Sequence, residues 1–490
     1  MKKKILTAIV AFTILGFSTT SCDDFVDTTP KYQLDSDAYF NSEEDYNKAL
    51  IGVYDILQST YVNVLLGEIA SDNTLAGGES ATDTPGFHQV DQMNHNPVNP
   101  NLKNVWDWMF AGVSRANYIM EYQDKTDFEG KEKVIAQTRF LRAYFHFELV
   151  KWFGGIPLKG DTRFVVGDET SIPRATAAEV YATIEEDLLY AIENMETGAQ
   201  EKGRITKGAA QALLGKVYLY QSKYQQAADV LETLIQTNAY TLVADYNTIF
   251  ENDGENGTES VFEVQYSDQE GAGFGCLQCS EGNVAVGFNG PRNFTGPLYD
   301  SGYSFNIPTQ EAYDIYEPGD NRRDVAILNI ADFVTANPGT TYGIGYEHTG
   351  FFNKKYIPRQ GDLNLGDSKL TNPNNYRAIR YADVLLMAAE AFNKIGNDDK
   401  ARTYVNLVRA RAFGDNNHNF VASGSGLGDQ IFDERRRELM GEGHRFFDLV
   451  RTGRGKLIPN FTKDKNELFP IPYEEIQFSN GNWKQNPGYN

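Results

Sequence analysis

Cysteine and histidine are scarce in this sequence, which has three cysteines and six histidines among 490 residues. The cysteine pair is Cys276-Leu-Gln-Cys279, and a structural zinc site would need a second pair of cysteines or histidines. No two histidines have the His-Glu-x-x-His spacing of metalloproteases. The sequence therefore predicts no metal site. In an oxidising environment Cys276 and Cys279 would form a local disulfide that stiffens a glycine-rich loop, and two free thiols are the alternative.

Long apolar runs and positive charge are also scarce. No apolar run after residue 17 is long enough to cross a membrane. The 45 lysines and arginines are outnumbered by 67 aspartates and glutamates, which gives a net charge of −22. This excess of negative charge argues against nucleic acids and other polyanions as partners. The densest basic run, Arg435-Arg436-Arg437, lies among acidic residues, so we expect a solvated network of ion pairs on a helix.

The first residues have the order of a bacterial lipoprotein signal. Three lysines precede a 13-residue apolar run, and small residues then lead to Cys22. This pattern predicts a signal peptide over residues 1–21, a lipidated Cys22 and a tether over residues 22–35, with an ordinary signal and an incidental cysteine as the alternative. Asp23 and Asp24 resemble the surface-export signal of Bacteroidota lipoproteins. We therefore expect a protein anchored in the outer membrane by lipid on Cys22 and exposed at the cell surface.

Apolar residues recur at helical spacing in two matched segments, residues 207–235 and 381–412. In each segment a short polar turn separates two helices, which must then pack antiparallel. Leu214 and Ala227 are 227 − 214 = 13 residues apart, and Ala388 and Ala401 are 401 − 388 = 13 residues apart. The spacing is close to the tetratricopeptide pattern, so the sequence predicts helical hairpins stacked into a superhelix. A generic helical core is the alternative.

The helical pattern stops in the middle of the chain. Residues 241–375 are loop-rich, with a short strand pattern at 259–265 and a stretch rich in glycine and aromatic residues at 267–308. We expect a mainly α-helical protein in which residues 36–240 form the first part of the scaffold. Residues 376–490 would form its second part and a C-terminal tail. The segment between them would be an inserted, loop-rich lobe that binds the ligand.

Two long segments are rich in polar and aromatic side chains, residues 67–101 and 267–308. Binding residues concentrate in long loops on a rigid scaffold. Sugar binding uses aromatic rings against the pyranose face, with amides and charged groups for the hydroxyls. The ligand-binding candidates are Asp72, Asn73, His88, Gln92, Asn94, Phe274, Phe288, Arg292, Phe294, Tyr299 and Tyr303. We expect one site shared by both segments, with Arg292 or an adjacent ring as its largest contributor. For any single aromatic residue, packing onto the scaffold is the alternative.

Five groups of residues resemble the SusD/RagB family of outer-membrane lipoproteins, in the family's order and over nearly all of the mature chain. They are 139–144 (RFLRAY) with 153–158 (FGGIPL), 379–391 (IRYADVLLMAAEA), 406–412 (NLVRARA), 434–449 (ERRRELMGEGHRFFDL), and 470–472 (PIP) with 485–489 (QNPGY). The resemblance implies a tetratricopeptide-like scaffold with an irregular, ligand-binding lobe. It also implies a SusC-like TonB-dependent transporter as partner, for which the lipoprotein is a hinged lid. Most members bind oligosaccharides, and the RagB branch binds peptides.

We therefore expect a surface lipoprotein that binds oligosaccharides and delivers them to a SusC-like transporter. A peptide-capturing protein of the same architecture stays open, because many glycan-binding members use tryptophan and none of the four tryptophans lies in either candidate segment. A tetratricopeptide scaffold lipoprotein with no small ligand is a third hypothesis. A glycoside hydrolase is the weakest, since carboxylate pairs are inevitable among 67 acidic residues. We expect no enzymatic activity and no cofactor.

Overall fold

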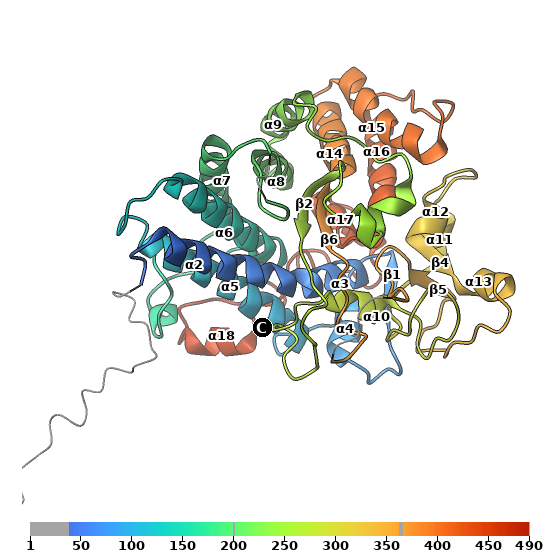
Figure 1. The fold of residues 1–490 in the computed structure, drawn as a ribbon, viewed down its shortest axis with the longest axis horizontal. Coiled ribbons are helices and arrows are strands. Elements are labelled where there is room, and N and C mark those ends of the chain that lie inside the picture. Colours follow the sequence, from blue (N-terminus) through green and yellow to red (C-terminus); the bar gives the residue numbers. More distant parts are fainter. Residues whose placement is uncertain (1–38, 199–200, 362–365, 490) are drawn as a thin grey trace, which may run out of the picture.

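The computed structural model describes residues 39–198, 201–361 and 366–489. The predicted signal peptide, Cys22 and the tether at 22–35 lie outside these residues. The scaffold helices are α2 (Glu43–Asp55), α3 (Tyr61–Ile69), α5 (Pro100–Glu121), α6 (Lys131–Phe153), α7 (Ala177–Asn194), α8 (Lys207–Tyr220), α9 (Tyr224–Gln236), α14 (Tyr381–Lys394), α15 (Asp398–Phe413), α16 (Gly424–Leu439), α17 (Arg445–Arg451) and α18 (Tyr473–Phe478) (Figure 1). Short 3-10 helices are η3 (Ile56–Thr60), η4 (Asp168–Thr170), η5 (Tyr246–Phe250), η6 (Asn252–Gly254) and η7 (Gly455–Leu457).

Polar side chains fix where several of these helices begin. Ser42 before α2 and Thr176 before α7 each form a capping box, in which the side chain accepts a backbone N–H three residues later and the acidic residue there bonds back. Thr206 caps α8 by accepting from the backbone N–H of the third helical residue. Asn397 caps α15 in the same way. Each cap satisfies a backbone donor that the helix itself cannot pair.

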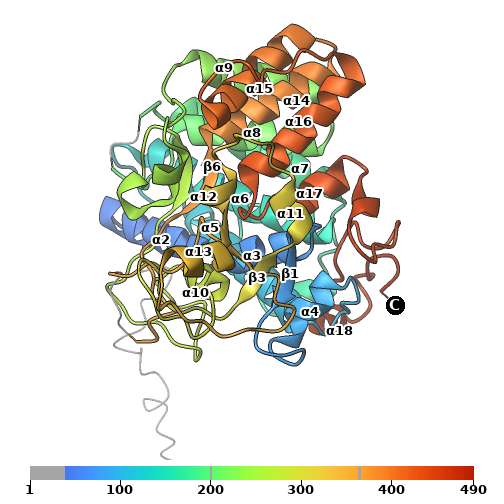
Figure 2. The ribbon, with the colours of Figure 1, turned by 90° about the vertical axis from the view of Figure 1, so that its right-hand side faces the viewer.

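The two helical hairpins expected from the sequence are confirmed. Helix α8 packs on α9, and α14 packs on α15. The close approach of α8 and α9 depends on Gly215, because a Cβ there would lie 2.4 Å from the side chain of Leu231. Successive contacts run from α5 to α6, α7, α8 and α9, so the hairpins form the expected tetratricopeptide-like superhelix (Figures 1 and 2).

The two parts of the scaffold are far apart in the sequence but continuous in space. Helix α9, the last of the first part, packs on α14, the first helix of the second part. The rings of Tyr240 and Tyr381 stack at this junction with centroids 6.3 Å apart. The Nζ of Lys400 lies 2.5 Å from a carboxylate oxygen of Glu232. The intervening lobe therefore leaves the superhelix and returns to it without interrupting its helix-to-helix packing.

The lobe contains short helices and antiparallel strand pairs. Its helices are α10 (Val284–Asn289), α11 (Gln310–Asp314), α12 (Arg323–Ala326) and α13 (Ile330–Ala336), and α4 (Pro85–Asp91) joins them from the N-terminal part. The strand pairs are β1 (Thr74–Gly77) with β3 (Phe305–Pro308), β2 (Ser260–Val264) with β6 (Tyr376–Arg380), and β4 (Ile327–Asn329) with β5 (Phe351–Asn353). Strand β2 confirms the strand expected at 259–265, and its pairing with β6 brings the two ends of the lobe together.

One helical stretch within the described residues, Glu43–Ile69, is long and apolar enough to cross a membrane by length and composition alone. The sequence expectation that no later run reaches this length is therefore too strict. In the structure 61% of its most apolar window is buried inside the protein. Leu50, Val53, Leu65 and Leu66 belong to the main hydrophobic core. The apolar character of this stretch therefore serves the core.

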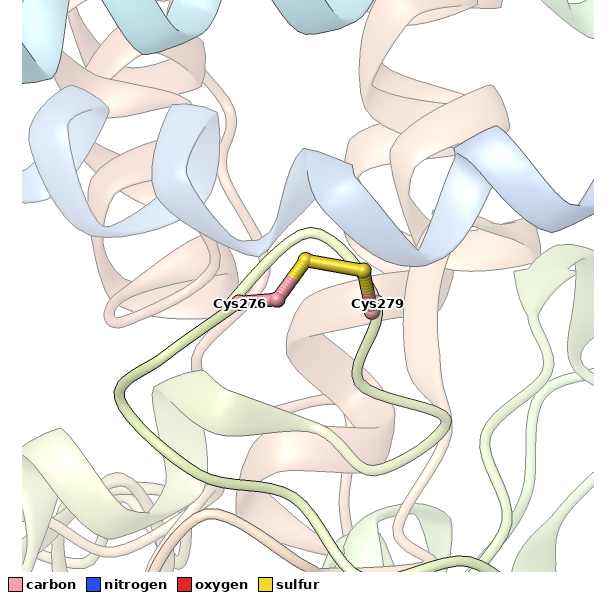
Figure 3. The surroundings of a disulfide bond; sticks show 2 residues. All are labelled: Cys276 and Cys279. Carbon is pink, nitrogen blue, oxygen red and sulfur yellow. A yellow bond between two sulfur atoms is a disulfide. The ribbon is translucent and has the colours of Figure 1, made fainter.

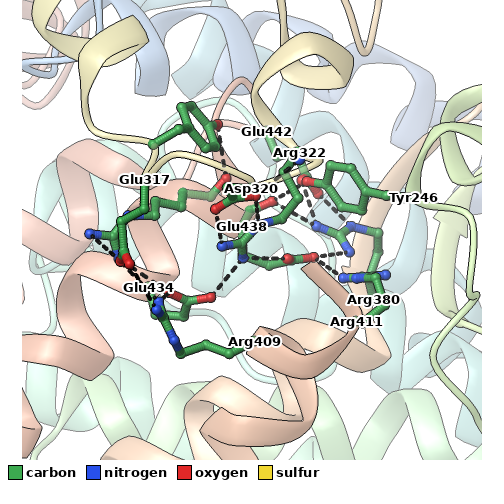
Figure 4. A network of polar contacts seen from close by, with 12 residues as sticks. Tyr246, Glu317, Asp320, Arg322, Arg380, Arg409, Arg411, Glu434, Glu438 and Glu442 are labelled. Carbon is green, nitrogen blue, oxygen red and sulfur yellow. Dashed lines mark hydrogen bonds and ion pairs between the residues drawn. The ribbon is translucent and has the colours of Figure 1, made fainter. Parts of the chain in front are cut away.

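A buried network of ion pairs joins the lobe to the scaffold (Figure 4). The guanidinium of Arg322, from the lobe, pairs with Asp320, Glu434 and Glu438. Arg380, at the end of β6, donates to Glu259, Glu438 and Glu442. Further cations in the same network are Arg411, which pairs with Glu259 and Glu438, and Lys355, which pairs with Glu442. Nearly all of these side chains are withdrawn from solvent, so each charge depends on its partners.

The basic run Arg435-Arg436-Arg437 forms ion pairs, as expected, but the expectation that they are solvated is wrong for Arg435. Its guanidinium is buried and pairs with Asp383 and Asp448. Arg436 and Arg437 are also largely covered, with side chains 9% and 14% exposed. Arg435 pairs with residues of α14 and α17, and Arg436 and Arg437 pair with Glu311 and Glu317 of the lobe, which the charge pattern of one helix could not show.

Candidate functional site

Strands β1 and β3 bring the two candidate segments of the sequence together. Thr74 lies opposite Pro308, and Gly77 lies opposite Phe305. The pairing continues beyond the strand, since the backbone N–H of Gly78 donates to the carbonyl of Ser304 at 2.7 Å. The segments at 67–101 and 267–308 are therefore neighbours, as the sequence predicted.

Three glycines let the backbone of the second segment fold closely on itself. A Cβ on Gly302 would lie 2.4 Å from the Cα of Gly290 and 2.6 Å from the carbonyl oxygen of Gly287. Contacts below 3 Å are not tolerated there, because the atoms met belong to the backbone. Tyr303 follows directly and donates its N–H to the carbonyl of Gly287 at 2.8 Å. The position of Tyr303 is thus fixed by the backbone on its N-terminal side.

Arg292 links the two segments through its guanidinium. It donates to Glu79 at 3.3 Å and Asp83 at 3.2 Å, both from the first segment, and to the carbonyl of Tyr303 at 3.0 Å. Its own backbone N–H donates to the hydroxyl of Ser304 at 3.0 Å. Only 17% of the side chain is exposed. Arg292 therefore holds two carboxylates beside Tyr303 at the surface.

A row of aromatic rings runs from the core to the surface. The rings of Phe87 and Phe288 are 5.7 Å apart, those of Phe288 and Tyr303 are 5.8 Å apart, and those of Tyr303 and Phe274 are 5.7 Å apart. Phe87 and Phe288 are buried, Tyr303 is half-buried, and Phe274 is 59% exposed. The row is therefore anchored at one end and presents a large apolar ring to solvent at the other.

The loop that carries Phe274 is held on both sides. Before it, Ala272 pairs with Gly366 and accepts the N–H of Asp367 at 2.9 Å. After it, a disulfide joins Cys276 to Cys279 and closes one turn of the loop (Figure 3). Phe274 thus sits on a constrained turn, which reduces the entropy lost when a ligand covers it.

Polar groups surround the exposed rings. The hydroxyl of Tyr303 donates to Asp367 at 3.0 Å, and the Nζ of Lys369 lies 5.0 Å from the centre of the Tyr303 ring. Burial and the contact with Asp367 raise the pKa of Tyr303, so the phenol stays neutral. We call the area formed by Phe274, Arg292, Tyr303, Asp367 and Lys369 the aromatic surface. It combines flat apolar rings with charged donors and acceptors, as sugar binding requires.

Comparison with known proteins identifies a family that shares this architecture. A sequence model of the SusD family matches residues 326–456, and a model described as starch-binding, associating with outer membrane, matches residues 24–219. A solved laminarin-binding SusD-like protein is 34% identical, and the match covers 92% of this chain and 100% of that chain with a TM-score of 0.84. This chain belongs to the SusD family. The expected tetratricopeptide-like fold is confirmed.

Other SusD-family relatives match over most of their length. Surface glycan-binding protein A from Bacteroides thetaiotaomicron, solved in complex with laminarihexaose, is 27% identical, with 91% of this chain and 99% of that chain covered and a TM-score of 0.80. SusD-like protein P2 of Formosa agariphila is 27% identical, with 98% of this chain and 99% of that protein covered. The relatives therefore share the scaffold and the lobe together.

Two of the candidate residues contact the scaffold of this SusD-family protein instead of solvent. The carboxylate of Asp72 accepts two hydrogen bonds from Arg445, at 2.7 and 2.8 Å, and its side chain is 7% exposed. Asn73 is buried between Glu68 and Arg436, at 3.2 and 2.8 Å. Their polar atoms are occupied by structural contacts, so we place both outside the proposed site.

The other candidates of the first segment lie on or near α4. His88 is buried, with Nδ1 3.9 Å from the carboxylate of Glu347 and its ring against Tyr346. Gln92 and Asn94 are exposed after the end of α4, where the amide of Asn94 donates to Gln92 at 3.3 Å. Nothing in these contacts connects Gln92 or Asn94 to the aromatic surface.

Three aromatic candidates pack the lobe, which was the alternative for each ring. Phe294 and Tyr299 are both 7% exposed and contact Phe333 of α13, with centroids 6.1 and 5.3 Å away. Phe288 is 6% exposed and packs against Tyr303 on the side that faces the core.

Sequence reasoning missed four polar residues beside the exposed rings. Glu79 and Asp83 lie inside the first candidate segment, but nothing in their spacing distinguishes them from its other acidic residues. Asp367 and Lys369 lie in a part of the lobe without any helical or strand pattern. They reach Tyr303 only through tertiary folding, which leaves no local signal.

Proposed function

We propose that this protein binds oligosaccharides at the aromatic surface and delivers them, as a surface-exposed lipoprotein of the outer membrane, to a SusC-like TonB-dependent transporter. The ligand we propose first is laminarin, because one similar solved protein is described as laminarin-binding and another was solved with laminarihexaose. Binding and delivery, without hydrolysis, is the role proposed here.

The observation that carries the proposal is the pair Phe274 and Tyr303. The side chain of Phe274 is 59% exposed, yet its turn is held by backbone pairing and a disulfide. The apolar surface of an exposed ring is unfavourably hydrated, and a sugar face that covers the ring would remove this free-energy cost. Arg292, Asp367 and Lys369 surround the rings with donors and acceptors for sugar hydroxyls.

Calorimetry with laminarin oligosaccharides tests the site directly. Phe274→Ala should weaken binding by roughly 1–3 kcal/mol, or about 5- to 150-fold in Kd, since one well-placed contact contributes about this much. The matched control is Phe478→Ala, because Phe478 is 60% exposed against 59% for Phe274 and lies on α18, away from the aromatic surface. Equal affinities of the two variants would exclude Phe274 from the site.

Two further outcomes concern the ligand class and the absence of turnover. Binding to a peptide library, with no binding on a glycan array, would refute the oligosaccharide assignment in favour of a peptide ligand. Laminarin oligosaccharides incubated with the purified protein should keep their length by chromatography. Heat-denatured protein is the control. Shortened products that form with the native protein, but not with the heat-denatured protein, would refute a pure binding role.

The anchor is tested by Cys22→Ala. The basic residues, the 13-residue apolar run and the small residues before Cys22 motivate it. The variant should leave the outer-membrane fraction and appear in a soluble or unprocessed form. A variant that is processed normally and stays at the cell surface would refute lipidation of Cys22.

A further inference from the structure

A second apolar feature lies between α5, α18 and the connection from α6 to α7. It is a hollow of about 560 Å³. Its walls are the aromatic rings of Trp106, Phe110, Phe164, Phe478 and Trp483. In both views α18 lies apart from α10, whose Phe288 packs against Tyr303 of the aromatic surface (Figures 1 and 2). We call this feature the apolar hollow.

Several apolar side chains on the rim of the apolar hollow are strongly exposed to solvent. Val165 is 61% exposed, Val166 is fully exposed, and Phe478 is 60% exposed. Tyr473 and Val98 extend the area, since the N–H of Tyr473 donates to the carbonyl next to Val98 and the two are 48% and 69% exposed. Exposed apolar side chains that gather in one place mark interaction surfaces, whereas single ones need no explanation.

The apolar hollow is held in shape without a ligand. Trp106 forms its floor, with ring centroids 4.7 Å from Phe110 and 6.1 Å from Trp483. The indole N–H of Trp483 donates to the carbonyl of Ile172 at 2.8 Å. The backbone N–H of Val165 donates to Asp168 at 2.8 Å, and Asp168 also pairs with a lysine. The valine tip is therefore a fixed projection beside a fixed recess.

The chemistry of the walls selects the class of occupant. The acidic residues Asp107, Glu169 and Glu475 line the hollow together with the aromatic rings. Lys103 pairs with two of these three acids, 2.7 Å from Asp107 and 3.6 Å from Glu475, so the lining keeps an excess of negative charge. A sugar stacks on exposed ring faces, whereas Trp106 and Trp483 are only 3% and 6% exposed and the projecting valines offer a sugar no hydrogen bond. An anionic lipid surface would be repelled, and so would the acidic segment 23–38 of this chain, which has five aspartates and one lysine.

The apolar hollow lies close to the start of the described chain. Tyr39 stacks on Tyr118 of α5 with centroids 6.4 Å apart, and Arg163 lies 4.2 Å above the same Tyr118 ring. The next residue, Phe164, contacts Phe110, which lines the hollow. Tyr118 and Phe110 are about 12 Å apart along the helix at 1.5 Å per residue. The hollow therefore lies on the side of the protein where the described chain begins.

We infer that the apolar hollow and the tip at Val165 and Val166 form a docking site for a protein partner. The partner presents a bulky apolar side chain for the recess, flanked by lysine or arginine that faces Asp107, Glu169 and Glu475. The assignment rests on the proposed function in one respect, namely that this partner is the SusC-like transporter.

Substitutions on the rim test the docking site in the lipid-anchored protein in its native membrane. Val166→Asp adds a charge to a fully exposed side chain, so it leaves the free protein folded, and Phe478→Asp does the same at the recess. Each should reduce co-purification of the transporter, identified by mass spectrometry, by about tenfold or more. The matched control is Val421→Asp, since Val421 is 87% exposed and lies before α16, away from the hollow. It should recover the transporter at the wild-type level.

The two proposals fail in different ways. Wild-type recovery of the transporter by both rim variants would overturn the docking site and leave the transporter partner intact. No transporter with the wild-type protein would overturn the partner itself and this assignment with it. Laminarin affinity should be unchanged in Val166→Asp, whereas Phe274→Ala should lose laminarin but keep the transporter.

A photo-reactive residue at position 166 identifies the contact chemically. It should crosslink to a transporter peptide that contains a bulky apolar residue beside lysine or arginine. A crosslink to lipid, to a second copy of this chain or to an acidic peptide would overturn the assignment.

Discussion

Replacing Arg380 by methionine should destabilise the protein more than the same replacement of an exposed arginine. Arg380 is 1% exposed, and all five of its N–H donors are used. They reach the carboxylates of Glu259, Glu438 and Glu442 and the backbone carbonyl of Glu438, at 2.7 to 3.1 Å. Methionine fills part of the volume but supplies neither charge nor donors.

The magnitude follows from what is left behind. Removing one partner of a buried ion pair costs about 3–5 kcal/mol, because the remaining charge stays desolvated. Glu438 and Glu259 keep Arg411, and Glu442 keeps Lys355, so none of the three carboxylates loses every cation. We therefore expect a loss near the lower end, about 3 kcal/mol. That is a large share of the 5–15 kcal/mol of a typical domain.

Urea unfolding followed by circular dichroism measures this loss. The matched control is Arg115→Met, since Arg115 and its partner Asp55 are 46% and 44% exposed and such pairs contribute about 0–1 kcal/mol. The double variant with Glu442→Gln should recover part of the loss, because it removes a buried negative charge that only Lys355 would still pair with. A loss below about 1 kcal/mol for Arg380→Met, equal to the control, would refute the argument that the network is buried and mutually dependent.

Three further predictions concern stability. Gly302→Ala should lower the free energy of unfolding by about 1–3 kcal/mol, because its Cβ would lie 2.4 Å from backbone, whereas Gly273→Ala, with no atom within 4 Å, should be neutral in the same urea titration. Burial would raise the pKa of Glu438 and Glu442, but neighbouring cations hold the pKa of both carboxyls below the ordinary value. Their contribution to folding stability is therefore complete above about pH 4.3, the pKa in the unfolded chain. As the pH falls below this value, the temperature of thermal unfolding should fall. Burial lowers the pKa of Lys355 to about 8, so the unfolded chain binds a proton that the folded one has lost between about pH 8 and 10. Stability should gain from this group as pH rises through that window, and an identical pH dependence in Lys355→Met would contradict it.

The helical hairpins could be predicted because their signal is local. A 13-residue spacing between small or apolar residues is set by one helix, one turn and the next helix, all within about 30 residues. Gly215 illustrates this, since its contact with Leu231 lies inside one hairpin. The packing of α9 on α14 has no such signal, because the whole lobe separates the two helices in the sequence.

The candidate site could be predicted as a region but not residue by residue. The two long segments do meet, through β1 and β3, and Arg292 does link them. Asp72 looked like a ligand residue from its segment, but its partner Arg445 is 373 residues away. Composition cannot distinguish an acidic side chain that faces solvent from one that faces a distant helix. Lys369 was missed for the same reason, since only the fold brings it over Tyr303.

The pairing of β2 with β6 has a consequence for how such a chain can change. Ser260, near the start of the lobe, lies opposite Arg380, at its end, so the lobe departs from the scaffold and rejoins it at neighbouring positions. The closure entropy of such a segment grows only slowly with its length, by about 0.6 kcal/mol for each doubling. Away from Arg322 and Lys355, whose buried ion pairs join the lobe to the scaffold, residues can therefore be added, removed or exchanged while α9 still packs on α14. The loops of the lobe outside that network form an exchangeable module, and changes at the proposed aromatic surface would have little cost to the helices that hold it.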